Sequence, residues 1–209
     1  GWPRASCGRT TAAAATSSPP TPVSSTSSPS RSSFWRSDRS SSSAATVDRF
    51  RTATADLDLE VESADSPRLV VSSADVVCTL TPSREPIVEG AWFRTGQHLN
   101  VVGAPPRADH REVDGAGMAA ARLVVDSRST ALAKSGDVLL AIEEGHLVAD
   151  DVAIELGDVI VRPGSGREHD EDITLFNSVG IGLQDLVTAR LLVDAATEQG
   201  VGTRVELAG

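Results

Sequence analysis

From residue 46 onward, apolar runs of strand length alternate with segments of helical periodicity. Residues 75–80 and 122–126 are continuous apolar runs, as expected for strands covered on both faces. The longest helical pattern, Gly182 to Gln199, repeats its apolar residues near 3.6-residue spacing. Strands that alternate with helices in this way predict an α/β fold with a Rossmann-like, doubly wound parallel sheet.

The same pattern predicts the other elements. Ser66 and Pro67 are the expected N-cap and first residue of a short helix that ends near Ala74. Further helices are expected at the chain ranges 47–55, 112–121 and 128–134, the last ending at Gly136. Further strands are expected at 57–62, 97–102, 173–176 and 203–207, and residues 152–161 continue the apolar pattern.

Residues 1–45 have a different character. Fifteen of them are Ser, and the only large apolar side chains are Trp2, Val23, Phe34 and Trp35. So little apolar surface predicts neither helix nor strand, and a disordered low-complexity segment is one interpretation. The other is an out-of-frame translation of a GC-rich gene, since the chain starts at Gly1 and has 18 Arg but a single Lys. We therefore divide the chain into 1–45 and 46–209, with the amino-terminal part of the fold incomplete or disordered.

Charge and cysteine content exclude several classes of function. Residues 46–209 carry 14 basic and 28 acidic residues, which argues against nucleic-acid binding. Two cysteines, Cys7 and Cys78, form neither a disulfide framework nor a metal-ligand spacing, so we expect no metal. No apolar run approaches the roughly 20 residues of a membrane span, and no signal-peptide pattern is present. We expect no membrane association and a cytoplasmic location.

Three loops follow strands of the predicted sheet, at 79–86, 100–112 and 174–185. Each places hydroxyl or small residues at a strand end, and the second adds a polar cluster: Arg107, Asp109, His110, Arg111 and Glu112. In open α/β sheets, ligands bind at the carboxyl ends of the strands. Each loop alone is ordinary turn chemistry. Together they predict a ligand site.

In this order, the segments ADVVCTLTPSREPIVEGAWFRTGQHLNVVGA, REVD, RLVVDS, KSGD, ELGDVI, GRE and DITLFNSVGIGLQDLVTA resemble the ornithine cyclodeaminase/mu-crystallin family. The resemblance covers about residues 56–207. It implies an NAD- or NADP-dependent enzyme that acts on a small amino acid or its imine, by oxidation or reduction or by cyclodeamination of ornithine to proline. It also implies a homodimer, and it makes residues 46–209 a partial NAD(P)-binding domain with a closing helix and strand.

The resemblance assigns roles to individual residues. It places Thr79 and Thr81 beside the cofactor ribose and phosphates. It places Val102, Gly103 and Ala104 alongside the nicotinamide. It also places Ser178 near the nicotinamide amide and Val179 facing the substrate. The family's catalytic aspartate occurs in two forms of this loop: Gly-Ala-Asp, or Arg-Pro-Asp followed by a run like Arg-Glu-Leu-Asp. Pro105 follows Gly103-Ala104 here, so the first form is absent. Asp109, in ADHREVD, fits the second form. Its role is then acid/base chemistry at an imine or activation of water.

Simpler interpretations stand beside these roles. Asp109 is otherwise a solvated loop acid. His98 alternates with apolar neighbours and is expected to pack at a strand edge, and His110 is expected to be exposed on its loop.

The sequence also departs from the family. It contains no GxGxxG turn for the cofactor diphosphate, and its only lysine, Lys134, lies in the KSGD segment rather than at the family's substrate lysine. We therefore expect the chain to be a poor catalyst. Two functional classes stay open: an impaired enzyme of this family, or a non-catalytic fragment or ligand-binding relative. NAD cannot be distinguished from NADP, and the substrate cannot be identified, from these residues.

Overall fold

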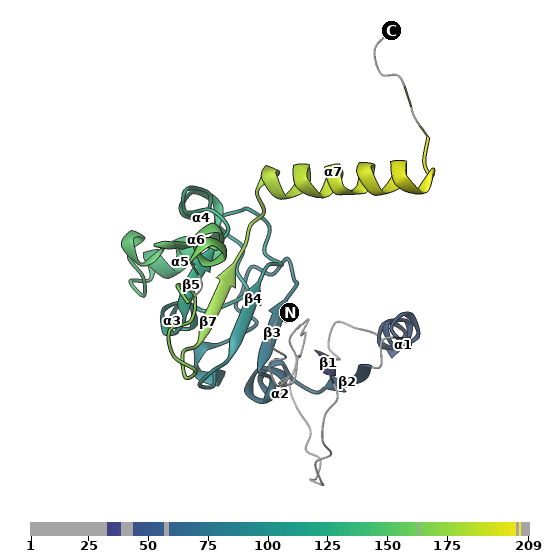
Figure 1. The fold of residues 1–209 in the computed structure, drawn as a ribbon. Helices are drawn as coiled ribbons and strands as arrows, with labels where there is room; N and C mark the ends of the chain where they lie inside the picture. The colour runs from purple at the N-terminus through teal and green to yellow at the C-terminus, as the bar shows by residue number, and fades with distance from the viewer. Residues whose placement is uncertain (1–32, 39–43, 57–58, 163, 204, 206–209) are drawn as a thin grey trace. The chain divides into compact units, whose positions relative to one another are not determined.

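The computed structural model describes residues 33–38, 44–56, 59–162, 164–203 and 205 (Figure 1). The chain divides into two compact units, Gly1–Val179 and Gly180–Gly209. The segment expected to be disordered lies mostly outside the described residues, as does most of the strand expected at 203–207.

The larger unit contains a five-stranded sheet that confirms the predicted fold class. Its strands are β3 (Val76–Thr79), β4 (His98–Val101), β5 (Arg122–Val125), β6 (Ile154–Glu155) and β7 (Thr174–Asn177). All neighbours are parallel, in the order β3-β4-β7-β5-β6 (Figure 1). The register sets the last residues of four strands side by side: Thr79, Val101, Asn177 and Val125. Every loop that follows these strands therefore starts from one edge of the sheet.

A second, two-stranded parallel sheet precedes the first. It pairs β1 (Ser33–Asp38) with β2 (Leu59–Ala64), and α1 (Ala44–Ala53) lies between them in the chain. The prediction of neither helix nor strand in residues 1–45 was therefore wrong at β1. The strand is defined by backbone pairing with β2, with Trp35 opposite Val61, and such pairing leaves no mark in the composition.

Short helices connect the strands of the larger unit. They are α2 (Pro67–Ser73), α3 (Gly115–Ala120), α4 (Arg128–Lys134), α5 (Gly136–Glu143) and α6 (Leu156–Val161), with single 3₁₀ turns at Gly90–Trp92 and Ala149–Asp151. The Ser66 side chain caps α2 by accepting a hydrogen bond from the Leu69 amide, as predicted. One predicted boundary was wrong, since α3 starts at Gly115 rather than at residue 112, and α5 was not predicted.

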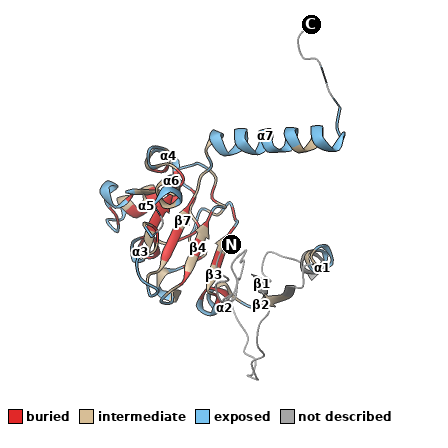
Figure 2. Ribbon diagram, viewed as in Figure 1, coloured by how far each residue is buried: buried red, intermediate tan, exposed pale blue. Residues whose placement is uncertain are grey.

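The core lies against one face of the sheet. Leu99 and Val101 of β4, Leu175 of β7 and Val125 of β5 are buried there with Met118 of α3. Figure 2 shows the buried residues concentrated in the strands and in the sides of α3 and α5. The alternation along β4 sends His98 and Asn100 to the opposite face.

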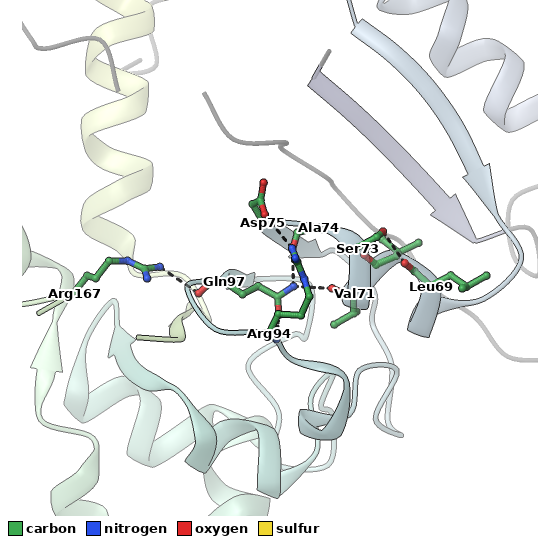
Figure 3. Close-up of polar contacts among 9 residues, drawn as sticks. Leu69, Val71, Ser73, Ala74, Asp75, Arg94, Gln97 and Arg167 are labelled. Carbon is green, nitrogen blue, oxygen red and sulfur yellow. Dashed lines mark hydrogen bonds and ion pairs between the residues drawn. The ribbon is translucent and has the colours of Figure 1, made fainter. Parts of the chain in front are cut away.

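The amino ends of β3 and β4 are tied to α2 by side chains (Figure 3). Gln97, which is fully buried, donates its amide hydrogens to the carbonyls of Val71 and Ala74 at 2.6 and 2.7 Å. Arg94 donates to the Ala74 carbonyl at 2.7 Å and pairs with the Asp75 carboxylate at 3.0 Å. These bonds satisfy the last carbonyls of the helix. The polar residues of this edge therefore have structural roles.

The smaller unit is dominated by α7 (Gly182–Gln199), whose bounds match the prediction. It ends at Gly200, which takes the left-handed conformation of a helix C-terminus, with φ of 66°. The helix is exposed along almost its whole length, including Leu186 and Leu191 (Figure 2). None of the helices among the described residues combines the length and apolar character needed to span a membrane.

Candidate functional site

The candidate site lies where β3, β4 and β7 end, and a buried glutamate connects the first two of these ends. Glu112 has no exposed surface. One carboxylate oxygen accepts hydrogen bonds from the Thr81 amide and, at 2.8 Å, the Thr81 hydroxyl. The other accepts from the Thr79 hydroxyl at 2.7 Å and the Gly103 amide at 2.8 Å. Four donors thus offset the cost of burying this charge.

The strand-end loops of β3 and β4 are packed too closely for a side chain at Gly103. A Cβ atom there would lie 2.1 Å from the Thr81 nitrogen and 2.3 Å from the Leu80 carbonyl carbon. Both neighbours are backbone atoms, which cannot rotate away. Glycine is therefore required at this position by contact between the two loops.

A second buried acid, Asp137, joins this arrangement to β7. It stands in the first turn of α5, and one of its oxygens accepts from the amides of Glu112 and Val113 at 2.8 and 3.0 Å. The other accepts from the Asn177 side chain at 3.3 Å. Burial raises the pKa of Asp137 to about 6, with the Glu112 carboxylate adding to the increase and the backbone hydrogen bonds opposing it.

A third acid, Asp126, holds the end of β7. It follows β5 directly and is 8% exposed. One carboxylate oxygen accepts from the Ser178 hydroxyl at 2.7 Å and from the Val179 amide at 3.1 Å. The other accepts from the Ser127 amide at 2.8 Å. The loop after β7 is therefore fixed to the end of the neighbouring strand.

Asp109 projects from the loop after β4. Its side chain is 59% exposed and its carboxylate contacts Arg84 at 3.1 Å and the His110 Nδ1 atom at 2.9 Å. The hydrogen bond from His110 lowers the pKa of Asp109, and the positive charge of Arg84 lowers it further. Asp109 is thus an anion at neutral pH, oriented from two sides.

The loop that carries Asp109 is anchored on both sides. The Arg111 amide donates to the Ser83 carbonyl at 3.0 Å. Gly136 approaches the His110 carbonyl so closely that a Cβ atom there would lie 1.9 Å from its oxygen. Contrary to prediction, His110 is buried, at 6% exposure, because α5 packs against its main chain. An exposed carboxylate on an anchored loop is a suitable arrangement for chemistry on a bound ligand.

The structure thus brings the sequence-predicted residues together in two groups. Thr79, Thr81 and Gly103 share Glu112, and Ser178 and Val179 share Asp126. Ala104 is buried and Val102 is 37% exposed. The hydroxyls of Thr79, Thr81 and Ser178 all donate to buried acids, so at these three positions a ligand meets chiefly the backbone.

The three acids that organise the site were not assigned a role from the sequence. Their signals were present: Asp126 ends a buried strand, Asp137 stands in a helix first turn after a Ser cap, and Glu112 lies three residues after Asp109. From the sequence alone, a carboxylate at a strand end is equally consistent with an exposed and with a buried position. Only the fold shows that these three carboxylates are buried. Among the described residues, no group of three or more His, Cys, Asp or Glu side chains is placed to hold a metal ion.

His98 lies away from these loops, on the opposite face of the sheet. Its ring contacts the Thr174 hydroxyl at 2.8 Å and the Asn100 side chain at 3.3 Å, and burial lowers its pKa. It lines a mostly apolar cavity of about 580 Å³ together with residues of β5, β7 and α6. His98 therefore packs within the sheet, as the simpler interpretation predicted.

The loops after β3, β4 and β7 lie at the edge where doubly wound sheets bind dinucleotides. Anchored loops after β3, β4 and β7 provide the backbone surface expected beside a nicotinamide and ribose. The GxGxxG turn that binds the diphosphate at a helix amino terminus in such domains does not occur in the sequence; Gly115 and Gly117, which open α3, do not directly follow a strand.

A parallel doubly wound sheet with these loops at its carboxyl edge defines a dinucleotide-binding type of domain. The sequence comparison is more specific. The model of the ornithine cyclodeaminase/mu-crystallin family matches residues 38–200, and the chain belongs to this family.

Individual relatives are enzymes of amino acid metabolism by name. The chain is 33% identical to alanine dehydrogenase of Archaeoglobus fulgidus over 149 residues, 71% of this chain and 46% of that protein. It is 43% identical to ketimine reductase mu-crystallin of Mus musculus over 136 residues, 65% of this chain and 40% of that protein. The chain spans less than half the length of these two relatives.

Solved structures agree with the sequence comparison. Delta(1)-pyrroline-2-carboxylate reductase of Thermococcus litoralis, in complex with NADH and L-proline, aligns with a TM-score of 0.75 and 32% identity, covering 83% of this chain and 53% of that one. An archaeal alanine dehydrogenase dimer with bound NAD aligns with a TM-score of 0.71 and 27% identity, covering 85% and 53%. Both relatives hold the type of cofactor that the sequence predicted.

Proposed function

We propose that this chain is the cofactor-binding part of an oxidoreductase that moves a hydride between NAD(H) or NADP(H) and an amino acid or its imine. The observation that supports this most directly is the anchored, anionic Asp109 at the edge of the sheet where β3, β4 and β7 end. The relatives' names supply the substrate class: pyrroline-2-carboxylate, ketimines and alanine.

The electrostatics of Asp109 suggest its part in the reaction. The bound cofactor would supply or accept the hydride. A carboxylate with a lowered pKa is a poor proton donor but a good partner for a positive charge. We infer that Asp109 stabilises the protonated imine, whose carbon accepts the hydride. In the oxidative direction, the same carboxylate would stabilise the positive charge that forms on the imine as the hydride leaves.

Titration with NADH, followed by fluorescence, tests the first part of this proposal. Oxidation of NADH at 340 nm with Δ1-pyrroline-2-carboxylate tests the second. We expect binding and slow turnover, because the sequence contains no diphosphate turn. The variant Asp109→Asn should lower kcat about 100-fold or more without changing the Kd for NADH. The matched variant Asp150→Asn, at a carboxylate that is 99% exposed, should change neither. Absence of NADH binding would contradict the proposal.

A non-catalytic, ligand-binding role is the second candidate. The observation that favours it is that the sequence contains no GxGxxG turn for the cofactor diphosphate. NADH binding without turnover on pyrroline-2-carboxylate, alanine or ketimines would support it. Release of ammonia from L-ornithine in the presence of NAD⁺ would instead identify a cyclodeaminase. We also propose a homodimer, since one aligned relative is described as a dimer; sedimentation velocity tests it.

A further inference from the structure

The most deeply engaged side chain near the site is Glu112, which touches neither solvent nor the exposed face of the loops. Its carboxylate binds the ends of two strands, and its main chain is bound as well. The Glu112 carbonyl accepts from the amides of Ile87 and Val88 at 2.9 and 3.0 Å, and its amide donates to Asp137. The side chain and the main chain of Glu112 are therefore each held by their own hydrogen bonds.

Glu112 is also linked to Asp109 through the chain. Only two residues separate them, His110 and Arg111, and this segment is held by the Arg111 amide on Ser83 and by Gly136 against His110. A displacement of Glu112 therefore moves the Asp109 loop and the ends of β3 and β4 together.

We propose that Glu112 is a positioning residue that sets the distance between the two strand-end loops and Asp109. The inference rests on the proposed function and adds to it the residue that fixes the relative positions of the two loops and Asp109. Glu112 itself contacts neither substrate nor cofactor in this scheme. It acts through the backbone at Thr81 and Gly103, the two amides that it binds.

The chemistry of the site requires a carboxylate here. Each oxygen of Glu112 accepts from one threonine hydroxyl and from one backbone amide, and the amides of Thr81 and Gly103 can only donate. A glutamine keeps one acceptor oxygen and turns an NH₂ group toward the other pair of donors. An aspartate is one methylene shorter and cannot reach both loops from the same main-chain position. Replacement by either residue should therefore release at least one loop.

The test compares Glu112→Gln with Glu85→Gln, a matched change at an exposed glutamate of the loop after β3. Hydrogen exchange measured by NMR reports the Thr81 and Gly103 amides directly. NADH titration of the same samples reports the consequence for the site. In Glu112→Gln we expect at least one of the two amides to exchange about 10-fold faster or more, amides of β5 to keep their protection, and NADH to bind about 10-fold more weakly. Glu85→Gln should match the wild type in all three.

Thr79→Val provides a second variant if Glu112→Gln fails to fold. It removes one donor to Glu112 without changing the side-chain volume, so faster exchange at Gly103 with unchanged β5 protection is expected. Unchanged exchange at both amides, or faster exchange with unaltered NADH affinity and unaltered kcat, would overturn the positioning role. Failure of the wild type to bind NADH would overturn the proposed function instead, and the exchange comparison would still decide whether Glu112 ties the loops.

Discussion

At the scale of single residues, Gly103 shows how tightly the site is built. A methyl group at this position would overlap the backbone at Leu80 and Thr81. Gly103→Ala should therefore force the two strand ends apart and lower the free energy of unfolding by about 2–3 kcal/mol. Gly157→Ala is the control, because Gly157 lies in α6 with open space around it. It should leave stability unchanged or raise it by up to about 1 kcal/mol. Urea unfolding measures both, and equal midpoints would refute the packing argument.

Asp137 gives the site a pH dependence with a defined sign. Its native pKa, raised by burial to about 6, exceeds the value of about 3.9 for an unfolded aspartate. The native state therefore holds the proton more tightly. The resulting stability is fully present below about pH 4 and is lost as the pH rises to about 6. The loss is of the order of 3 kcal/mol.

The variant Asp137→Asn removes this titration but keeps an oxygen acceptor for the amides of Glu112 and Val113. Relative to the wild type, its unfolding free energy should rise between pH 4 and pH 6 and then level off. Urea unfolding at half-unit pH intervals measures the difference. Asp150→Asn, at an exposed carboxylate, should run parallel to the wild type. A parallel curve for Asp137→Asn would mean that Asp137 titrates normally.

The residues show where sequence reasoning succeeds and where it stops. Ser66 and Pro67 were predicted as a helix start because capping is a local interaction. Gly136 was taken as a helix end, since glycine commonly ends helices, but it opens α5 because only glycine fits against the His110 carbonyl. The loop chemistry was recognisable, but the burial of Glu112 depends on residues 25 to 33 positions away.

At the scale of elements, the carboxyl end of α2 is bound by two side chains from another segment, Arg94 and Gln97. Buried Gln97 donates to the carbonyls of Val71 and Ala74, both near the end of this helix (Figure 3). Gln97→Leu removes both donors and leaves these carbonyls with fewer partners. We expect a loss of about 1–3 kcal/mol of stability.

Measurement by urea unfolding tests this role, with hydrogen exchange of the amides in α2 as the local readout. Gln199→Leu, at an exposed position of α7, is the matched control and should cost less than about 0.5 kcal/mol. An equal effect of the two changes would show that Gln97 is not a helix cap.

The start of α3 is also set by side chains from outside the helix. Glu112 and Val113 donate their amides to Asp137, so the helix begins only after Asp114, whose side chain caps it.

At the scale of the whole molecule, the five-stranded sheet and the closing helix were predictable, because strand and helix periodicities are strong over residues 75–199. The pairing of β1 with β2 was not, since the partner strand β1 lies in a segment without apolar periodicity. The most informative departure is chemical. The loops after β3, β4 and β7 are present and anchored, while no GxGxxG turn for a diphosphate occurs in the 209 residues.

This asymmetry makes a quantitative prediction about ligand size. A full-length relative, such as the Thermococcus litoralis reductase, should bind NADH far more tightly than reduced nicotinamide mononucleotide, because a helix amino terminus and a glycine-rich turn contribute at the diphosphate. In this chain the second half of the dinucleotide gains little, so we expect the two ligands to bind within about 10-fold of each other. Fluorescence titration of both proteins with both ligands measures the two ratios side by side. If this chain favours NADH as strongly as the relative does, other residues supply the diphosphate contacts. The interpretation that the cofactor site of this chain is impaired would then be wrong.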